Sequence, residues 1–559
     1  MTATLTLDAP IQPRIESPTV VSVQGLDVSF TDASRRKREV VQKISFDLRA
    51  GECLAIVGES GSGKSVTART LVGLTGAGAE VTAEQLQING QGVRSLTQRQ
   101  WRELRGNKIG FVSQDALVAL DPFQKVGSEV GQALKIHTEL EPKQRQKRVL
   151  ATLAAVGVPH PELRAQQRPF ELSGGLRQRA VIASALITSP ALLIADEPTT
   201  ALDVTLQKQI LDLLKLAKED GTAVLLVSHD LAVVNELADR VLVMKDGQIV
   251  ETGPVEKVLR QPQHAYTQRL RDAVPTPQTR GHRLAPHLPT QLGDLPAARL
   301  RERPNEPLLT AANLTKTYKM PAGGRLTAVR DVSLQVLPGQ TLGIVGESGS
   351  GKSTTARILA GLEIADSGEV HVLGEKWSSL SRRKKQELRK HIGFIYQDPL
   401  SSFDPRWSVE KILIDAIGFT GISNMKSRER ARELLSIVGL ESSVTDRHPL
   451  HLSGGQRQRV AIARALATTP EIIICDEPVS ALDVSVQATI LDLLTDLQEA
   501  LGIAYVFISH DLGVVHHLAD ELIVMKDAAI VERGNAVEVF TQPEHPYTQK
   551  LLTALPAFA

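Results

Sequence analysis

Short runs of apolar residues alternate along this chain with longer stretches in which apolar and polar residues mix in an amphipathic, helix-like way. The most uniform runs are nearly free of polar side chains and span residues 53–57, 191–195, 225–227, 341–345, 471–475 and 506–508. Continuous apolar runs of this kind are typical of strands that are buried on both faces of a parallel sheet. Their alternation with amphipathic helices predicts an α/β fold.

The second half of the chain repeats the first half. Residues 58–65, Gly-Glu-Ser-Gly-Ser-Gly-Lys-Ser, recur without change at 346–353, and later motifs follow in the same order at nearly constant intervals. A repeat of this length indicates two homologous domains. Residues 275–307 contain seven prolines and no periodic apolar pattern, which is typical of a semi-rigid spacer. We therefore expect a disordered tail over 1–20, a first domain over 21–274, a linker over 275–307 and a second domain over 308–559.

The repeated octapeptide follows an apolar run and precedes a helix-like stretch, as a phosphate-binding P-loop requires. Its glycines allow backbone N–H groups to turn inward and bind an anion at a helix N-terminus. Lys64 and Lys352 are expected to reach the β- and γ-phosphates of a nucleotide, and Ser65 and Ser353 to ligate Mg²⁺. The predicted nucleotide ligands of the two loops are Gly58, Ser60, Gly61, Gly63, Lys64, Ser65, Gly346, Ser348, Gly349, Gly351, Lys352 and Ser353.

An acidic pair ends a buried run in each half, as Asp196-Glu197 and as Asp476-Glu477. Ligands bind at the carboxyl ends of the strands of parallel sheets, so both pairs are expected beside the P-loops. Asp196 and Asp476 are predicted to hold Mg²⁺, and Glu197 and Glu477 to polarise the attacking water. A pair that only caps a helix would explain one copy, but it is a weaker explanation for two.

Two further polar positions recur after strand-like runs. His229 and His510 are predicted to sense the γ-phosphate, although a single histidine at such a place is more often structural. Gln114 and Gln397 are predicted to orient water or Mg²⁺. The predicted Mg²⁺ ligands are thus Ser65, Gln114, Asp196, Ser353, Gln397 and Asp476.

One aromatic residue precedes each P-loop lysine by the same interval: Phe30 in the first half and Tyr318 in the second. An aromatic ring at this position is suited to stack on adenine. The alternative for both residues is a place in the hydrophobic core.

Composition narrows the setting of these sites. The 559 residues are 42% hydrophobic and 23% charged, with a net charge of +1, as expected of folded domains without an overall attraction to nucleic acid. The two cysteines, Cys53 and Cys475, lie in apolar runs and offer no disulfide framework and no zinc or iron–sulfur cluster. No stretch is long and apolar enough to span a bilayer, so any pore would belong to another chain.

Further motifs resemble those of one family. Residues 172–175 (Leu-Ser-Gly-Gly) and 452–456 (Leu-Ser-Gly-Gly-Gln) resemble the signature of ATP-binding cassette (ABC) ATPases, and residues 200–203 and 480–483 resemble the D-loop of that family. The resemblance covers both halves. It implies two tandem P-loop domains of the RecA-like type, each with an antiparallel β subdomain and a helical signature subdomain, that hydrolyse ATP with Mg²⁺.

The same resemblance implies two ATP molecules held between head-to-tail cassettes, with each P-loop facing the signature of the other half. It adds to the nucleotide-binding residues Ser173, Gly174, Gly175, Asp203, Ser453, Gly454, Gly455, Gln456 and Asp483. The first half departs from the pattern at Leu176, where the signature has glutamine, and at Ser184, where the second half has Arg464. Both departures affect the site built on Lys352 and Glu477, which is therefore expected to turn over more slowly.

A finer resemblance is to the importers of oligopeptides, dipeptides and nickel, carried by residues 114–122, 397–405 and the His-Pro-Tyr-Thr-Gln motif at 545–549. It implies a subunit at the cytoplasmic face of the inner membrane that energises two permease subunits supplied by an extracytoplasmic binding protein. Short peptides are the expected cargo, with glutathione, haem, nickel complexes and opines as alternatives. Many members carry a cysteine cluster after the tyrosine motif; this chain has none there, so no iron–sulfur cluster is expected.

Three other classes of protein share part of this pattern. A tandem cassette protein acting on ribosomes would carry a long charged helical arm, whereas this linker is rich in proline. A DNA-repair ATPase would need zinc-binding cysteines or coiled-coil insertions. A subunit of an exporter would lack the markers of the peptide importers. The importer is therefore the favoured interpretation.

Overall fold

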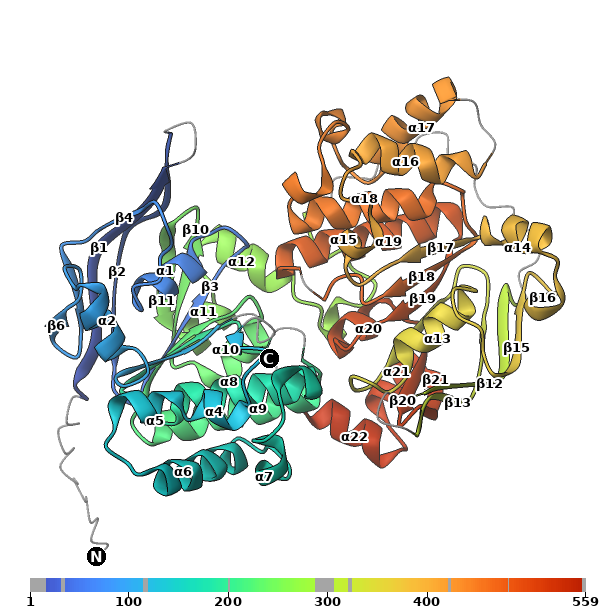
Figure 1. Cartoon of the computed structure of the whole chain (residues 1–559). Coiled ribbons are helices and arrows are strands. Elements are labelled where there is room, and N and C mark those ends of the chain that lie inside the picture. The colour runs from blue at the N-terminus through green and yellow to red at the C-terminus, as the bar shows by residue number, and fades with distance from the viewer. Residues whose placement is uncertain are drawn as a thin grey trace, which may run out of the picture. The chain divides into compact units, whose positions relative to one another are not determined.

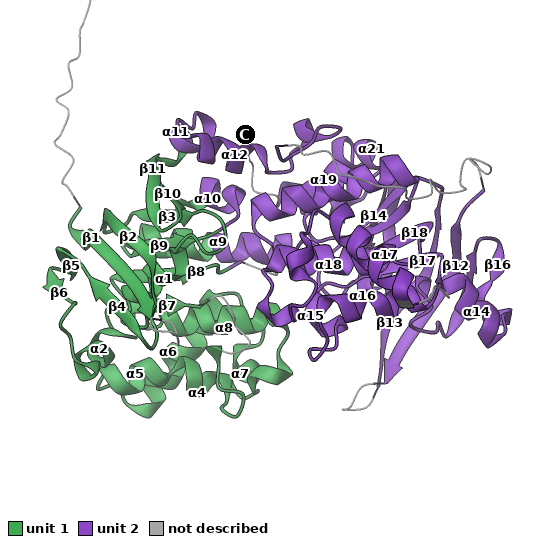
Figure 2. Ribbon diagram, turned by 90° about the horizontal axis from the view of Figure 1, so that it is seen from above, with its two compact units in different colours: residues 1–198, 212–228, 237–255 green, residues 199–211, 229–236, 256–559 purple. Residues whose placement is uncertain are grey.

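The computed structural model describes residues 17–31, 36–113, 119–199, 202–286, 306–319, 324–420, 424–480 and 482–554. The chain divides into two compact units (Figure 2). The first unit comprises residues 1–198, 212–228 and 237–255, and the second comprises residues 199–211, 229–236 and 256–559. The predicted tail lies outside the described residues as far as residue 16, and the first strand already begins at Thr19.

The first unit contains two sheets (Figure 1). The antiparallel sheet has the order β2-β1-β5-β6, with β4 paired to β1; these strands are β1 (Thr19–Thr31), β2 (Lys37–Arg49), β4 (Ala79–Thr82), β5 (Gln85–Ile88) and β6 (Gln91–Gly92). The second sheet has the order β11-β10-β3-β9-β8-β7 and is parallel except at β11. Its strands are β3 (Cys53–Val57), β7 (Ile109–Val112), β8 (Leu192–Asp196), β9 (Ala223–Val227), β10 (Arg240–Lys245) and β11 (Gln248–Pro254).

Helices of the first half pack on the mixed sheet and on one another. Helix α1 contacts β8 and β9, and α8 contacts β7 and is itself packed against α4 and α6. The helices are α1 (Lys64–Thr70), α2 (Gln98–Leu104), α4 (Val126–Val130), α5 (Gln132–His137), α6 (Pro142–Ala155), α7 (Pro161–Arg164), α8 (Gly174–Leu186), α9 (Val204–Glu219), α10 (Leu231–Leu237), α11 (Val255–Arg260) and α12 (Ala265–Asp272). Single 3-10 turns follow at Pro169–Glu171 and Pro277–Thr279.

The second unit repeats the two sheets. Its antiparallel sheet has the order β13-β12-β15-β16, and its mixed sheet has the order β17-β18-β19-β14-β20-β21. The strands are β12 (Leu309–Lys319), β13 (Arg325–Val336), β14 (Thr341–Val345), β15 (Ser367–Val372), β16 (Glu375–Lys376), β17 (Ile392–Ile395), β18 (Ile472–Asp476), β19 (Ala504–Ile508), β20 (Glu521–Lys526) and β21 (Ala529–Asn535).

The helices of the second half follow the same plan. Helix α13 contacts β18 and β19, and α16, α17 and α18 form a helical layer. The helices are α13 (Lys352–Leu359), α14 (Arg382–Arg389), α15 (Pro399–Ser402), α16 (Val409–Gly418), α17 (Asn424–Ile437), α18 (Gly454–Leu466), α19 (Val484–Leu501), α20 (Leu512–Leu518), α21 (Ala536–Thr541) and α22 (Pro546–Thr553), with 3-10 turns at Trp377–Ser379, Ser442–Val444 and Pro449–His451. Within the described ranges, no helix is long and apolar enough to cross a membrane.

The predicted apolar runs form the central strands. Every residue of β3, β8 and β9, and of β14, β18 and β19, is buried. Burial on both faces explains why these strands lack the alternation of apolar and polar residues seen in half-exposed strands. The α/β fold class predicted from the sequence is thus confirmed.

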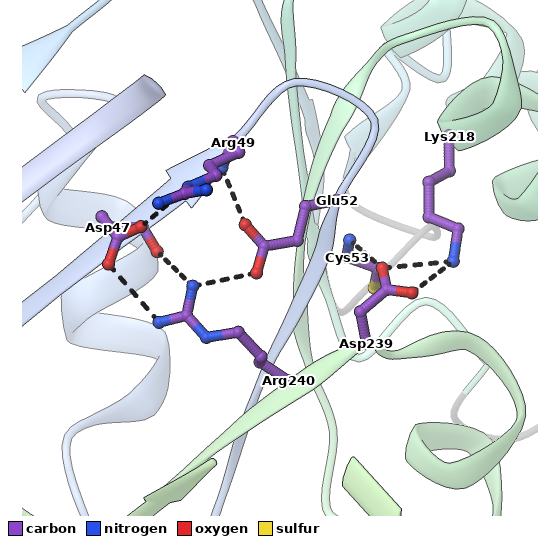
Figure 3. A network of polar contacts seen from close by, with 7 residues as sticks. All are labelled: Asp47, Arg49, Glu52, Cys53, Lys218, Asp239 and Arg240. Atoms are coloured by element: carbon purple, nitrogen blue, oxygen red, sulfur yellow. Dashed lines mark hydrogen bonds and ion pairs between the residues drawn. The ribbon is translucent and has the colours of Figure 1, made fainter. Parts of the chain in front are cut away.

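A polar network fastens the amino end of β3, opposite the end that leads into the P-loop (Figure 3). Arg240 Nη1 donates to Glu52 Oε1 at 2.9 Å, and its Nη2 lies 3.4 Å from Asp47 Oδ1. The guanidinium group therefore joins the first residue of β10 to β2 and to the turn before β3.

Asp239 extends this network to the backbone of β3. Its Oδ2 accepts a hydrogen bond from the N–H of Cys53 at 2.8 Å, and its Oδ1 lies 3.1 Å from Lys218 Nζ on α9. Burial raises the pKa of the Cys53 thiol far above its usual value, so Cys53 packs as a neutral side chain.

We expect the Asp239→Ala substitution to lower the free energy of unfolding by about 1–3 kcal/mol, because it removes the acceptor of a β-strand N–H at a buried residue. Urea unfolding followed by circular dichroism measures the change. Glu103→Ala, which removes an exposed carboxylate 3.6 Å from Arg99, is the control and should change stability by less than about 0.5 kcal/mol. Equal effects of the two substitutions would contradict the role given to Asp239.

Candidate nucleotide-binding site

The mixed sheet of the second unit brings its predicted site residues to one edge. Strands β14, β17, β18 and β19 are parallel, so their carboxyl ends lie together. The P-loop follows β14, Gln397 follows β17, Asp476 ends β18 and His510 follows β19. Ligands of α/β proteins bind at this edge.

Glycines allow the P-loop to pass close to neighbouring backbone. Gly346 and Gly351 have φ angles of 151° and 100°, which side-chain-bearing residues rarely adopt. A Cβ atom on Gly346 would overlap the carbonyl oxygen of Met525, and one on Gly351 would overlap that of Ala328. Gly351 also caps α13, so the loop presents N–H groups at a helix N-terminus, where phosphate binds.

Lys352 lies inside the loop, where Nζ donates to the carbonyl oxygens of Gly346 at 2.7 Å and Glu347 at 2.9 Å. Burial lowers its pKa, although nearby carboxylates, Glu477 first among them, oppose that change. A buried ammonium group held by carbonyl oxygens is ready to contact the phosphates of a nucleotide.

Ser353 donates its hydroxyl hydrogen to Asp476 Oδ1 at 2.8 Å. In the first half, Ser65 donates to Asp196 Oδ1 at 2.9 Å, and the buried Asp196 Oδ2 accepts no hydrogen bond but lies 3.8 Å from Arg69 Nε. Burial raises the pKa of both aspartates. A hydroxyl beside a carboxylate fits Mg²⁺, which takes oxygen ligands.

Glu477 is the centre of a polar cluster. Its Oε2 accepts a hydrogen bond from Gln397 Nε2 at 2.8 Å and lies 3.1 Å from His510 Nδ1. Its φ angle of 50° is left-handed, and its N–H donates to the carbonyl oxygen of Ile508 at 3.0 Å. The strained backbone thus aims this carboxylate away from the Mg²⁺-type ligands and towards the histidine.

A cavity of about 350 Å³ joins these groups. Lys352, Ser353, Gln397, Glu477 and His510 all line it. Tyr318 lines the same cavity and is 37% exposed. The tyrosine is therefore accessible from the cavity, and its stacking on adenine stays a prediction.

Phe30 occupies the corresponding place in the first half but is partly buried against the core cluster that contains Val28 and Val41. The alternative of a core residue therefore describes part of its contacts. Its ring also approaches Gly76, which lies after α1.

The first half repeats the geometry of the loop. Lys64 Nζ donates to the carbonyl oxygens of Gly58 at 2.8 Å and Glu59 at 2.9 Å, and Glu197 has a φ angle of 52°. The Glu197 N–H donates to Val227 O at 2.9 Å, as its counterpart does to Ile508. Gln114 lies outside the described residues.

The two signatures begin their helices differently. Ser453 caps α18 through a reciprocal pair of hydrogen bonds with Gln456, of 3.1 and 3.2 Å. Ser173 caps α8 without a side-chain hydrogen bond, and Leu176 has no side-chain oxygen to accept the reciprocal bond from the Ser173 N–H. Gly455 is required by packing, since a Cβ atom there would lie 2.5 Å from Val486 Cγ1.

Arg464, absent from the first half, joins the signature helix to the segment after β17. Its Nη1 and Nη2 donate to the carbonyl and hydroxyl oxygens of Ser402 at 2.8 and 2.9 Å, and its guanidinium lies 4.8 Å from the ring centre of Phe403. Ser184 is too short to make these contacts. The departures noted in the sequence therefore correspond to lost hydrogen bonds.

The D-loop aspartates cap the helices that follow them. Asp203 Oδ1 accepts from Leu206 N at 3.0 Å, and Asp483 Oδ1 accepts from Val486 N at 3.1 Å. Within the second unit, Asp203 Oδ2 also accepts from the N–H of Ser348 at 3.3 Å.

Tyr547 is a site residue that the sequence analysis missed. Its hydroxyl oxygen accepts a hydrogen bond from the N–H of Glu347 in the P-loop at 3.1 Å, and Lys526 Nζ lies 4.9 Å from its ring centre. The signal was present, because Tyr547 belongs to the His-Pro-Tyr-Thr-Gln motif. Spacing alone did not place that motif beside the P-loop.

The Glu477–His510 pair predicts a pH dependence. Burial would lower the pKa of His510 and raise that of Glu477, but their mutual hydrogen bond and charges outweigh it, so the pKa of His510 rises and that of Glu477 falls. The histidine contributes stability in full below its ordinary value of 6.5 and loses it as pH rises through the raised pKa. The glutamate contributes above 4.5 and loses it as pH falls through the lowered pKa.

We therefore expect His510→Ala to destabilise the protein more at a pH near 6 than at a pH near 9. Urea unfolding of both proteins at the two pH values gives the difference. A loss of stability that is the same at both would contradict the charged pairing.

The comparisons with known proteins agree with these motifs. The family model described as ABC transporter matches residues 41–200 and 329–480, and the model described as oligopeptide/dipeptide transporter, C-terminal region, matches residues 250–298 and 531–559. The glutathione import ATP-binding proteins GsiA of Salmonella choleraesuis (strain SC-B67) and Escherichia coli (strain K12) are both 42% identical over 568 residues, which covers 98% of this chain and 91% of each relative.

Among solved structures, the dimeric ATP-binding cassette MJ0796 bound to ADP and Pi is 34% identical and covers 41% of this chain and 98% of its own, with a TM-score of 0.38. The assignment to a family rests on the matches to the two family models and on the relatives of full length. The predicted pair of ABC nucleotide-binding domains is confirmed, and so is the activity, ATP hydrolysis coupled to transport. The chain belongs to the ABC transporter ATPases, in a tandem form in which each ABC transporter match is followed by the C-terminal region of the oligopeptide/dipeptide transporters.

Proposed function

We propose that this chain is the energising subunit of an importer for short peptides, and that glutathione, itself a tripeptide, is the first cargo to test. The observation that carries the proposal is the oligopeptide/dipeptide C-terminal region after both cassettes. The relatives of full length, described as glutathione import ATP-binding proteins, support the same direction and cargo. Two permease subunits, an extracytoplasmic binding protein and a place at the cytoplasmic face of the inner membrane complete the proposed assembly.

In the proposed ATPase site, the P-loop N–H groups and Lys352 bind the β- and γ-phosphates. Ser353 and Asp476 hold Mg²⁺, with Gln397 as a further oxygen donor; the ion, when bound, neutralises charge on the phosphates. Glu477 accepts a proton from the attacking water as the water is oriented, and His510 holds the glutamate in position. Ser65, Asp196, Glu197 and His229 fill these roles in the first half.

The proposed pairing is head to tail. Lys64, Asp196 and Glu197 are completed by the signature of the second half (Ser453, Gly454, Gly455 and Gln456), and Lys352, Asp476 and Glu477 by that of the first (Ser173, Gly174 and Gly175). A hydrogen bond supports this arrangement, because Asp203 from the D-loop of the first half contacts Ser348 in the P-loop of the second. A signature at a helix N-terminus adds a positive dipole end to the γ-phosphate.

The two sites are proposed to differ in rate. The signature that serves the second P-loop lacks the cap made by Gln456, since Leu176 stands there. Fewer N–H groups at the start of this signature helix are therefore bound by side chains than in the second half. The site that depends on Glu477 is therefore the slower one.

We expect Glu197→Gln to remove a larger share of single-turnover ATP hydrolysis than Glu477→Gln, and the double variant to retain less than about 1%. Both glutamines keep the size of the side chain and remove its basicity, so ATP binding should persist. Measuring ATP binding alongside hydrolysis then distinguishes a loss of chemistry from a loss of binding. Leu176→Gln is the complementary change and should raise the turnover that remains in Glu197→Gln. Equal losses in the two single variants would remove the asymmetry.

The proposed cargo is tested by purifying the tagged chain from gently solubilised membranes with whatever proteins accompany it. Two multi-span proteins and a binding protein would support the importer, and the complex can then be reconstituted in liposomes. Stimulation of ATP hydrolysis by binding protein with glutathione, or with dipeptides, haem, nickel complexes or opines, identifies the cargo. Ribosomal proteins in place of permeases would overturn the proposal.

A further inference from the structure

The segment that follows α12, residues 275–286, is docked on the second cassette. We call this segment, residues 275–286, the strap. It belongs to the stretch expected from the sequence to be a proline-rich spacer, yet it contacts two helices of the second unit, α19 and α20. Leu284 is only 4% exposed and is part of the core cluster that contains Leu491 and Leu494 of α19.

Ionic contacts fix the strap to α19. Arg283 Nη2 lies 2.8 Å from Asp496 Oδ1 and 2.7 Å from Glu499 Oε2, and its Nε donates to the same Asp496 oxygen at 3.0 Å. The side chains of Arg283 and Asp496 are only 24% and 11% exposed, so solvent screens this pair less than a fully exposed one.

The strap backbone is bound as well. The N–H groups of Leu284 and Ala285 donate to the carboxylate of Asp492, at 3.0 and 2.8 Å. Burial raises the pKa of Asp492, and these two N–H groups oppose that rise. Because this carboxylate accepts hydrogen bonds from two successive backbone N–H groups, it fixes the conformation of the strap backbone.

On α20, the strap contacts the last turn. Arg280 Nη1 donates to the carbonyl oxygen of His516 at 2.6 Å, and its Nη2 lies 3.7 Å from Asp520 Oδ1. The hydroxyl of Thr279 lies 3.2 Å from His517 Nδ1. A guanidinium at a helix C-terminus donates to a carbonyl oxygen that has no partner within the helix. Its positive charge also interacts favourably with the negative end of the helix dipole.

The strap also meets the first turn of α20. A Cβ atom on Gly513 would lie 2.9 Å from the carbonyl oxygen of Pro275, closer than Cβ atoms are found. In the first half, the motif His229-Asp-Leu-Ala-Val-Val has Ala232 at this position. Glycine is thus present in the half that receives the strap.

A second position differs in the same sense. When Asp203 is aligned with Asp483, Leu216 of the first half falls opposite Asp496. Leu216 is 57% exposed, whereas Asp496 is bound by Arg283. The first half therefore lacks both the glycine and the aspartate that the strap contacts in the second half.

The first turn of α20 is directly joined to the proposed hydrolysis site. Asp511 caps α20 by accepting from the N–H groups of Gly513 and Val514, at 2.9 and 3.2 Å. His510 is the preceding residue, and its Nδ1 lies 3.1 Å from Glu477 Oε2. A shift of α20 therefore moves the histidine that holds the glutamate.

We propose that the strap is a positioning element for hydrolysis in the second cassette: by holding α19 and both ends of α20, Arg280, Arg283 and Pro275 fix His510 against Glu477. The proposal rests on the proposed roles of those two residues. The segment that follows the first cassette would thus control ATP hydrolysis in the second cassette. The strap residues touch no substrate and act through α20.

The test measures kcat and the KM for ATP of the full chain carrying Arg280→Ala and Arg283→Ala. We expect kcat to fall about tenfold while KM changes less than about twofold, because a misplaced base slows chemistry without weakening phosphate binding. Both the wild-type and the Glu197→Gln backgrounds are measured. If the two ATP sites are obligatorily coupled, the full loss of kcat appears in the wild-type background. If they act independently, the full loss appears in the Glu197→Gln background.

Two variants address the docking without deleting the arginines. Gly513→Ala introduces the residue of the first half and should lower kcat by pressing on Pro275. Arg283→Glu should also lower kcat, and adding Asp496→Arg should restore it to within about threefold, since the ion pair is rebuilt with its charges exchanged. Leu216→Asp, the matched change on the first half, is the control and should leave kcat unaltered.

A kcat that Arg280→Ala/Arg283→Ala leaves unchanged in both backgrounds, or a change confined to KM, would overturn the proposal, as would failure of the exchanged pair to restore the rate. If Glu197→Gln and Glu477→Gln both retain wild-type turnover, the assignment of the glutamates fails instead. Circular dichroism and thermal unfolding of each variant separate these outcomes from loss of folding.

Discussion

The close approach of bare backbone at the end of a buried strand is the constraint on which the nucleotide site depends. Gly346 and Gly351 occupy positions where any Cβ atom would overlap a carbonyl oxygen of a neighbouring segment. That fit directs the N–H groups of the loop to one place and draws Lys352 inside, onto the carbonyl oxygens of Gly346 and Glu347. The first half meets the same requirement at Gly58 and Lys64.

Around that loop the sheet separates two kinds of carboxylate. The aspartate at the end of β18 points to the P-loop serine, while the adjacent Glu477, in a left-handed conformation, points to His510 and Gln397. Successive residues of an extended strand face opposite sides. The left-handed conformation at Glu477 further directs its carboxylate towards His510 and Gln397. Two adjacent residues thereby supply a carboxylate suited to Mg²⁺ and a second carboxylate suited to act as a base.

The halves are alike in backbone and differ at the helix ends. Gln456 and Arg464 hold the signature of the second half, whereas Leu176 and Ser184 leave that of the first with fewer hydrogen bonds. The strap is bound where Asp496 and Gly513 replace Leu216 and Ala232. Duplication followed by such local changes gives two cassettes with one architecture and unequal support around their sites.

The sequence by itself determined the buried strands, both P-loops, the acidic pairs and the tandem α/β plan, because each depends on a few neighbouring residues: continuous apolar runs, glycine spacing and polar residues at strand ends. Only the tertiary structure decided which distant groups meet. It placed Tyr547 on the P-loop, brought His510 and Gln397 to the same oxygen of Glu477, and placed Tyr318 in the cavity while Phe30 packs partly in the core. It also showed that part of the proline-rich stretch is docked, since the carboxylates that bind Arg283 lie over 200 residues further along the chain. Proline content reports the stiffness of a segment, whereas its place in the structure depends on contacts that local sequence does not contain.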